Sequence, residues 1–461
     1  MKPWISIVVF LLGIGSLSAQ KYYVSDIRIE GNKRTRDHII LRQLEVQKGD
    51  SVRVDRIRHI LNVSTENLEN SSLFNYVFMY YTILEEGVDN IVLNVRVEER
   101  WYTIPMLNIR YDDRNFSAWL KNRDLNRVKL ELGAHVYNLW GLDHRVTAGL
   151  QLGYQQAINL TYKNITLDRR QKHFLTSGIS LQKSHYAEPM TEADAPFGVK
   201  TPDLLLTQGV DLFVLYTFKH DVRTTHNILL AADYKKIADT VLTLNPHYWG
   251  NAQKERVNLN LHYFFRKDNR NYIAYPLKGY FLKIGTQFYA SQDWSVRYAQ
   301  LYTNAQYYKT WGNRWYASEL FTAGLSLKNA KAYLLDQALG YKETPFRGYE
   351  YHVIDGQHYA NLNSSLRFNI LPKTVYVLNW LSALPKINKP YFALYATAFI
   401  DMGAAYHSYP GPNNHLSNQF LYSGGIGLDL VTYYDLVFML YYSLNKEREQ
   451  GFYFEIKLPF L

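Results

Sequence analysis

From Trp101 onward, apolar and polar residues alternate along the chain in one segment after another. An early example places apolar side chains at every second position, namely at Val128, Leu130, Leu132, Ala134 and Val136. Successive side chains of a strand point to opposite faces, so each such segment predicts a strand with one apolar and one polar face. Sixteen segments of this kind start near residues 102, 126, 143, 157, 174, 204, 226, 255, 278, 296, 315, 358, 391, 420, 434 and 451. Their serial arrangement is typical of an antiparallel transmembrane β-barrel over residues 101–461.

The gaps between these segments support an even strand count, which returns the C-terminus to the end where the barrel begins. The long gaps at residues 187–203, 240–254, 329–357 and 404–419 all follow odd-numbered strands, so one end of the barrel would carry all four. Residues 372–390 are long for a connection at the opposite end. A short interfacial helix is expected there, with an apolar face of Trp380, Leu381, Leu384 and Ile387.

Residues 21–100 follow a different pattern, in which helical periodicity and strands are mixed. The sequence predicts the order strand, helix, helix, strand, strand over residues 22–30, 36–44, 54–62, 77–84 and 91–98. Thr35 is the expected N-cap of the first helix. About 80 residues suffice for one small α+β domain with its own core.

The first residues have the layout of a secretory signal peptide. Met1-Lys2 is followed by an apolar core from Trp4 to Gly15 and by small residues that end at Ala19. We therefore expect a signal peptide over residues 1–19 and export from the cytoplasm. A retained membrane anchor is the alternative, although the apolar core is short for a membrane span.

The composition of the chain excludes several classes of function. The chain of 461 residues has no cysteine, which excludes disulfides, thiolate metal sites and cysteine nucleophiles. Neither a G-x-S-x-G nor an H-E-x-x-H motif occurs, so no enzyme, cofactor or metal site is predicted.

The net charge of +10 fits anionic lipid head groups better than nucleic acid, because no recognition motif accompanies it. The 40 tyrosines suit a membrane–water boundary. A secreted β-sandwich or propeller remains the alternative fold, but no repeat supports a propeller.

Two sets of residues resemble a known family. In residues 21–100 these are Ile27, Ile29, Gly31-Asn32, Thr35, Gly49-Asp50, Leu73-Phe74, Val95, Val97 and Glu98-Glu99. In this order, after a signal peptide and before a barrel, they resemble a POTRA domain. POTRA is the periplasmic module of the BamA/TamA outer-membrane assembly superfamily.

The second set lies in the barrel. Phe346-Arg347-Gly348-Tyr349 is similar to the tip of the family's sixth extracellular loop, which folds back into the lumen. Phe399, Asp401 and Gly403 match a barrel-wall element of the family, and Arg367 is expected to face inward beside it. The resemblance implies that Arg347 pairs with Asp401 inside the lumen. Ser365 stands where the family often has an acidic residue.

The resemblance also implies a function in the bacterial outer membrane, with the POTRA domain in the periplasm. Unfolded client proteins would add a strand to the POTRA domain and then template on the seam between the first and last barrel strands. Trp101, Pro105, Gly451 and Phe460 mark that seam, and Pro105 cannot donate a ladder hydrogen bond. Expected partners are client proteins, outer-membrane lipid and accessory envelope proteins. A dedicated secretion pore and a plugged barrel that anchors a partner complex remain open.

Overall fold

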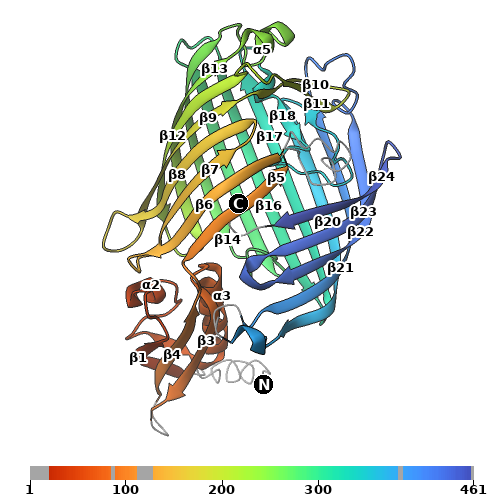
Figure 1. Ribbon diagram of the computed structural model, residues 1–461. Coiled ribbons are helices and arrows are strands. Elements are labelled where there is room, and N and C mark those ends of the chain that lie inside the picture. Colours follow the sequence, from red (N-terminus) through yellow and green to blue (C-terminus); the bar gives the residue numbers. More distant parts are fainter. Residues whose placement is uncertain (1–19, 85–88, 112–127, 383–387, 458–461) are drawn as a thin grey trace, which may run out of the picture. The chain divides into compact units, whose positions relative to one another are not determined.

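The computed structural model describes residues 20–84, 89–111, 128–382 and 388–457, so the predicted signal peptide lies outside the described residues. The chain divides into two compact units between Arg100 and Trp101. The first unit is a small α+β domain, and the second is a barrel (Figure 1). In the described residues, no helix is long and apolar enough to cross a membrane.

The first unit is a four-stranded sheet packed against helices. Its elements are β1 (Lys21–Glu30), α2 (Asp37–Leu41), β2 (Ser51–Arg53), η1 (Val54–Arg56), α3 (Ile57–Asn70), β3 (Phe74–Ile83) and β4 (Asn90–Glu99). The strand order is β2-β1-β4-β3, in which only β1 and β4 are parallel. The predicted order of strands and helices is confirmed, and the short β2 is an addition that pairs with the start of β1. The core contains Val24, Val46, Val52, Ile57, Ile91 and Leu93.

Thr35 does not cap the first helix, and that prediction was wrong. Arg36 occupies the N-cap position of α2 and makes no side-chain cap bond. The backbone N–H and the hydroxyl of Thr35 both donate to the buried carboxylate of Glu99 at 2.7 Å, and the N–H of Arg34 donates at 3.0 Å. Glu99 lies 64 residues further along the chain, so this competing acceptor is invisible to a local reading of the sequence.

The second unit is built on a sixteen-stranded antiparallel sheet, which confirms the predicted fold. Every predicted strand start lies within three residues of an observed one. The strands are β5 (Thr103–Tyr111), β6 (Val128–Leu139), β7 (His144–Leu152), β8 (Gln155–Thr166), β9 (His173–Ser184), β12 (Thr207–Lys219), β13 (Thr224–Ile237), β14 (Glu255–Asp268), β15 (Gly279–Ser291), β16 (Arg297–Trp311), β17 (Trp315–Lys328), β20 (His358–Val375), β21 (Tyr391–Tyr406), β22 (Phe420–Thr432), β23 (Val437–Asn445) and β24 (Gln450–Lys457).

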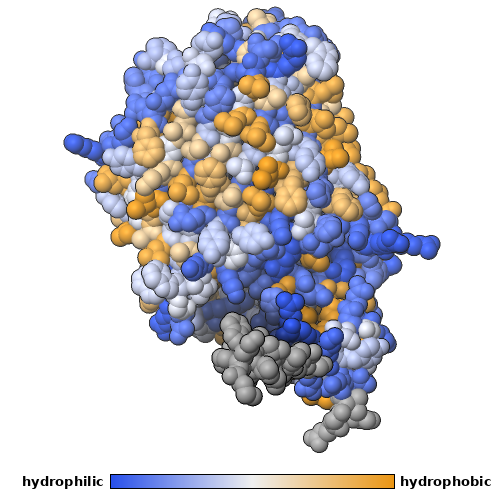
Figure 2. Space-filling view, turned by 180° about the vertical axis from the view of Figure 1, so that it is seen from behind, coloured by the Kyte–Doolittle hydropathy of each residue, from blue (hydrophilic) through white to orange (hydrophobic). Residues whose placement is uncertain are grey.

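The wall of the barrel separates apolar from polar side chains, as the alternating pattern requires. Leu212, Leu230, Leu259 and Phe288 stand on the outer face and are about half exposed. In Figure 2 such side chains form a hydrophobic band across the barrel, below a hydrophilic top. The positions between them, such as Asn260, face the lumen. We call the end where β5 begins and β24 ends the near end, and the opposite end the far end.

The far end carries the long connections that the gap lengths predicted. They hold the hairpin of β10 (Tyr186–Glu192) and β11 (Ala195–Lys200), the helix α5 (Asp239–Leu244), and the elements η3 (Tyr333–Leu335), β18 (Gln337–Leu339) and β19 (Ile354–Asp355). Asp194 in the β10–β11 hairpin accepts hydrogen bonds from the backbone N–H groups of His415 and Leu416, both at 3.0 Å. Val353 donates its N–H to the carbonyl of Asp194 at 2.8 Å. Three far-end connections are therefore tied together.

The connection between β20 and β21 differs from its prediction. The ladder of these two strands extends to the pair Val375 and Tyr391, which absorbs part of the expected loop. The described part contains only a three-residue turn of 3₁₀ helix, η4 (Asn379–Leu381). Trp380 lies in this turn and is strongly exposed, whereas Leu384 and Ile387 lie outside the described residues. A second such turn, η5 (Tyr433–Asp435), joins β22 to β23.

We expect Glu99→Ala to destabilise the first unit by about 2 kcal/mol, because it removes the buried acceptor of two backbone N–H groups and one hydroxyl. Hydrogen exchange of the intact protein, followed on peptides from α2 and β4, measures the effect. Glu98→Ala on the same strand is the matched control. Equal exchange in the two variants would contradict a structural role for the Glu99 carboxylate.

Candidate functional site

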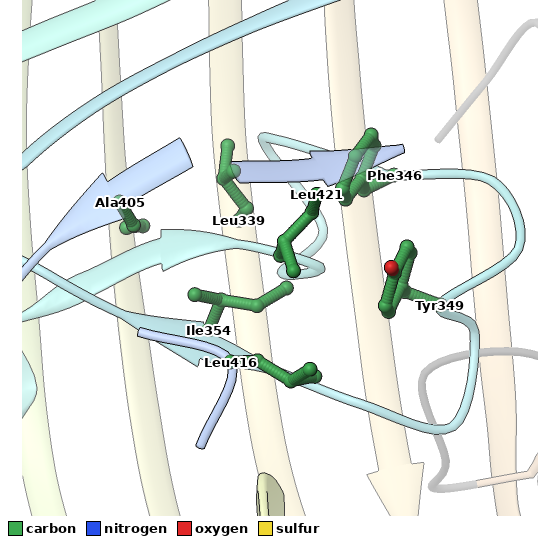
Figure 3. Close-up of a cluster of buried hydrophobic side chains, with 8 residues drawn as sticks. Leu339, Phe346, Tyr349, Ile354, Ala405, Leu416 and Leu421 are labelled. Atoms are coloured by element: carbon green, nitrogen blue, oxygen red, sulfur yellow. The ribbon is translucent and has the colours of Figure 1, made fainter. Parts of the chain in front are cut away.

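The connection of residues 329–357 between β17 and β20 folds back into the barrel, and we call it the lumen loop. Its apolar side chains build a buried cluster with residues of the wall and of the neighbouring far-end connection (Figure 3). The cluster consists of Ala338, Leu339, Phe346, Tyr349, Ile354, Ala405, Leu416 and Leu421. The rings of Phe346 and Tyr349 stack with centroids 5.0 Å apart. Burial of this cluster holds the loop inside the lumen.

Arg347 at the tip of the loop forms an ion pair with Asp401 on β21. The Arg347 Nε donates to Asp401 Oδ2 at 2.9 Å, and Nη2 donates to Oδ1 at 2.5 Å. The backbone N–H of Arg347 adds a third bond to the same carboxylate at 3.2 Å. Asp401 is completely buried, so its charge depends on these donors. The two parallel side-chain bonds suit a guanidinium, whose planar fork matches a carboxylate.

Wall residues surround this ion pair and use its remaining hydrogen-bonding groups. Asn363 on β20 donates to Asp401 Oδ2 at 2.6 Å. Ser365 accepts a bond from Arg347 Nη1 at 3.1 Å, so a hydroxyl here occupies the place of the family's acidic residue. The guanidinium carbon lies 4.0 Å from the ring centre of Phe399, in a cation–π contact. The ion pair itself thus contributes one positive and one negative charge to the site.

Gly348 lets the loop pass close to the wall. Its φ is +87°, a conformation that favours glycine, and a Cβ added there would lie 2.6 Å from the Cβ of Ser423. Ser423 on β22 donates its hydroxyl to the carbonyl of Arg347. Asn445 on β23 donates to the carbonyl of Gly348 at 2.9 Å. The loop backbone is thus bonded to two further wall strands.

Glu350 follows the tip and is enclosed between the loop and the wall. Its Oε1 accepts bonds from the N–H of Gly348 at 2.9 Å and from the hydroxyl of Tyr441 at 2.7 Å. Burial raises the pKa of Glu350 to about 7, although both hydrogen bonds favour the ionised form and the nearby Asp401 charge opposes it. In the docked loop, the protonated and ionised forms of Glu350 are therefore about equally populated near neutral pH.

The structure brings together most of the residues chosen from the sequence, but not all of them. Phe346, Arg347, Gly348, Tyr349, Phe399 and Asp401 meet at the docked tip. Gly403 lies further along β21, where a Cβ would come within 3.1 Å of Leu339 in the loop. Arg367 faces the lumen but contacts a different segment, with its Nη1 bonded to the carbonyl of Pro276 at 3.2 Å.

The predicted seam lies between the two terminal strands of the sheet. β5 and β24 are at opposite ends of the strand order, and no ladder joins Thr103–Tyr111 to Gln450–Lys457. Pro105 pairs with Ala134 on β6, and Gly451 pairs with Ser443 on β23. Trp101 precedes β5 and is exposed, while Phe460 lies outside the described residues.

Sequence reasoning missed the polar residues that complete the site. They are Asn363 on β20, Ser423 on β22, and Tyr441 and Asn445 on β23, and no local motif marks them. The only sequence signal for these residues is that they occupy lumen-facing positions of the alternating pattern. Within the described ranges, no three His, Asp or Glu side chains are grouped in a way that could hold a metal ion.

We expect Arg347→Ala to weaken docking of the loop by about 3 kcal/mol, because Asp401 loses its buried counter-charge. The chain has no cysteine, so a single Ala338→Cys substitution in the buried cluster reports docking. A water-soluble maleimide should label this cysteine roughly a hundredfold faster when Arg347 is replaced. Arg314→Ala, in an exposed near-end turn, is the control and should leave the labelling rate unchanged.

Docking should also weaken as the pH rises. The pKa of Glu350 is raised by docking from 4.5 to about 7, so the docked form is favoured below this range and loses that advantage between pH 4.5 and 7. The measurement is the labelling rate of Ala338→Cys divided by that of the double variant Ala338→Cys with Glu350→Gln. We expect this ratio to be roughly tenfold or more higher at pH 8 than at pH 5. The same ratio at both pH values would exclude Glu350 as the cause.

Two protein families and several solved structures are similar to this chain. The POTRA family, described as surface antigen variable number repeat, matches residues 22–100, and the Omp85 superfamily domain matches residues 107–458. Among curated protein sequences, none matches this chain.

Solved structures share the fold at low sequence identity. BamA from Haemophilus ducreyi lacking POTRA domains 1–3 is 14% identical with a TM-score of 0.51, covering 94% of this chain and 83% of that one. CdiB from Escherichia coli is 11% identical with a TM-score of 0.54, covering 95% and 76%. CdiB from Acinetobacter baumannii is 11% identical with a TM-score of 0.50, covering 95% and 74%. Because the Omp85 superfamily domain matches most of the chain, the chain belongs to the Omp85 superfamily of outer-membrane β-barrel proteins.

Proposed function

We propose that this protein assists the insertion of client β-barrel or surface proteins into the outer membrane. The observation that carries the proposal is the seam, where the described parts of β5 and β24 share no ladder. The terminal strands of a sheet each have one edge outside its ladders, and backbone N–H and C=O groups on such an edge can template an incoming strand. Pro105 on β5 and Gly451 on β24 both weaken regular pairing at this place.

The first unit would receive clients before they reach the barrel. β3 is an edge strand of its sheet, and its exposed side chains include Phe78 and Tyr80, whose ring centres are 5.6 Å apart. An extended client segment can add to such an edge through main-chain hydrogen bonds, with the two aromatic rings as apolar contacts. Binding of this kind tolerates many client sequences, because the backbone supplies most of the bonds.

The lumen loop supports a route along the seam rather than through the lumen. Arg347 and the buried cluster hold the loop inside the barrel, so a client in the lumen would have to displace both. The signal peptide over residues 1–19 would direct export, with the domain of residues 21–100 in the periplasm and the barrel of residues 101–461 in the outer membrane. The apolar band would contact outer-membrane lipid, and accessory envelope proteins would bind the first unit.

A dedicated secretion pore is the second candidate, and a plugged barrel that anchors a partner complex is the third. The pore would use the lumen and would require the loop to leave the wall. Neither an enzymatic reaction nor a bound cofactor or nucleic acid is part of any of these proposals.

Depletion of the protein, followed by quantification of the whole outer-membrane proteome, separates these functions. We expect the levels of several other barrel proteins to fall severalfold, because unassembled barrels do not persist in the periplasm. Loss of a single secreted or surface protein would instead indicate a dedicated translocator. An unchanged proteome would contradict the proposal.

Complementation with edge variants then tests the first unit. Phe78→Asp combined with Tyr80→Asp should leave the domain folded, since both side chains are exposed, and should fail to restore the depleted proteins. Arg28→Ala on β1 of the same sheet is the control and should complement fully. Full complementation by the β3 variant would exclude this edge as the client site.

A further inference from the structure

A near-end turn of ten residues, 269–278, joins β14 to β15 and is called the inner turn here. It reaches β20, β21 and β22, although β16 and β17 separate β15 from β20 in the sheet. The wall residues that it meets point inward, because their strand neighbours Leu366 and Leu428 stand exposed on the outer face. The inner turn therefore crosses part of the lumen.

Tyr275 anchors the inner turn to the wall. Its hydroxyl donates to Asp429 Oδ2 on β22 at 2.6 Å, and its ring is almost completely buried. The guanidinium carbon of Arg367 lies 4.7 Å from the centre of this ring, while Nη1 of Arg367 donates to the carbonyl of Pro276. Thr397 on β21 donates to the same carboxylate oxygen of Asp429 at 2.7 Å.

Tyr272 makes a second attachment nearby. Its hydroxyl is bonded to the carboxylate of Asp435 in η5 and lies 3.0 Å from the hydroxyl of Tyr391, the first residue of β21. Asp435 is buried beneath these contacts. The inner turn is thus held on three neighbouring wall strands, β20, β21 and β22, and on η5, which joins β22 to β23.

An ion pair and two hydrogen bonds fix the base of the inner turn. Arg270 donates from Nε and Nη2 to the two oxygens of Asp268 at 2.8 and 2.7 Å, and both side chains are nearly buried. The side chain of Asn271 accepts bonds from the N–H groups of Leu277 and Lys278 at 3.1 and 3.0 Å. These bonds close the neck of the turn, so Tyr272 and Tyr275 are presented by a preformed loop rather than by a flexible one.

We propose that the inner turn is a second closure of the lumen, in series with the lumen loop. The loop enters from the far end and docks on Asp401, and the turn enters from the near end and docks on Asp429. Both use the inner face of β21 and β22, and Arg367 and Asp429 are the positioning residues of the near-end closure. This inference goes beyond the proposed client function and does not depend on it.

Conductance of the purified full-length protein in planar bilayers tests the series arrangement. The loop is released by Arg347→Ala and the turn by Tyr275→Phe combined with Arg367→Gln. Because resistances in series add, releasing either closure alone should change the mean conductance by less than about twofold, while releasing both should raise it by roughly fivefold or more. Heat-modifiable migration in detergent gels verifies that each variant forms a folded barrel.

Tyr302→Phe combined with Lys283→Gln is the matched control. These residues form another lumen-facing pair of a tyrosine and a cation, with Lys283 Nζ 5.2 Å from the ring centre of Tyr302. With Arg347→Ala, this control should give the conductance of Arg347→Ala alone. The proposal is overturned if Arg347→Ala alone reaches the conductance of the combined variant, or if the control opens the barrel as far as the turn variant does.

Discussion

The buried ion pair between Arg347 and Asp401 is the constraint on which the interior of this barrel depends. Asp401 has no access to water, so its charge is tolerated only while the loop supplies the guanidinium and the backbone N–H. That requirement fixes where the loop tip lies, and the tip in turn places Gly348 against Ser423 and Glu350 beneath Tyr441. The hydrophobic cluster around Tyr349 stabilises the same position without adding any charge.

The inner face of β20, β21 and β22 serves as a common anchoring strip for segments that arrive from both ends of the barrel. Asp401 and Asp429 are its two acidic positions, and each is paired with a hydrogen-bond donor from a segment that enters the lumen. The seam between β5 and β24 lies near this strip, since only β23 separates β22 from β24 in the sheet. Contacts inside the lumen can hold β20, β21 and β22 in place while β5 and β24 separate nearby, and this arrangement fits the insertion at the seam that we propose.

Much of the architecture was accessible from local patterns. Alternation with a period of two located all sixteen strands, because a strand between lipid and lumen must change face at every residue. Arg347 and Asp401 resemble family motifs, and this resemblance predicted that they pair. Thr35 shows where local sequence patterns fail. Its neighbours predicted a helix cap, but its hydroxyl donates instead to the carboxylate of Glu99, 64 residues away. No sequence prediction pointed to the near-end closure, because the partners of the inner turn lie on strands that no local motif connects to it.

The sequence by itself determined the strands, their inward and outward faces and the two-part organisation, because each of these follows from the order of apolar and polar residues along a short stretch. Only the tertiary structure decided which inward residues meet. Tyr275 and Asp429 are 154 positions apart, and they touch because the sheet curls and brings the turn after β14 opposite β22. The curvature of the wall is a property of all its strands together, so the contacts across the lumen cannot be deduced from any single strand.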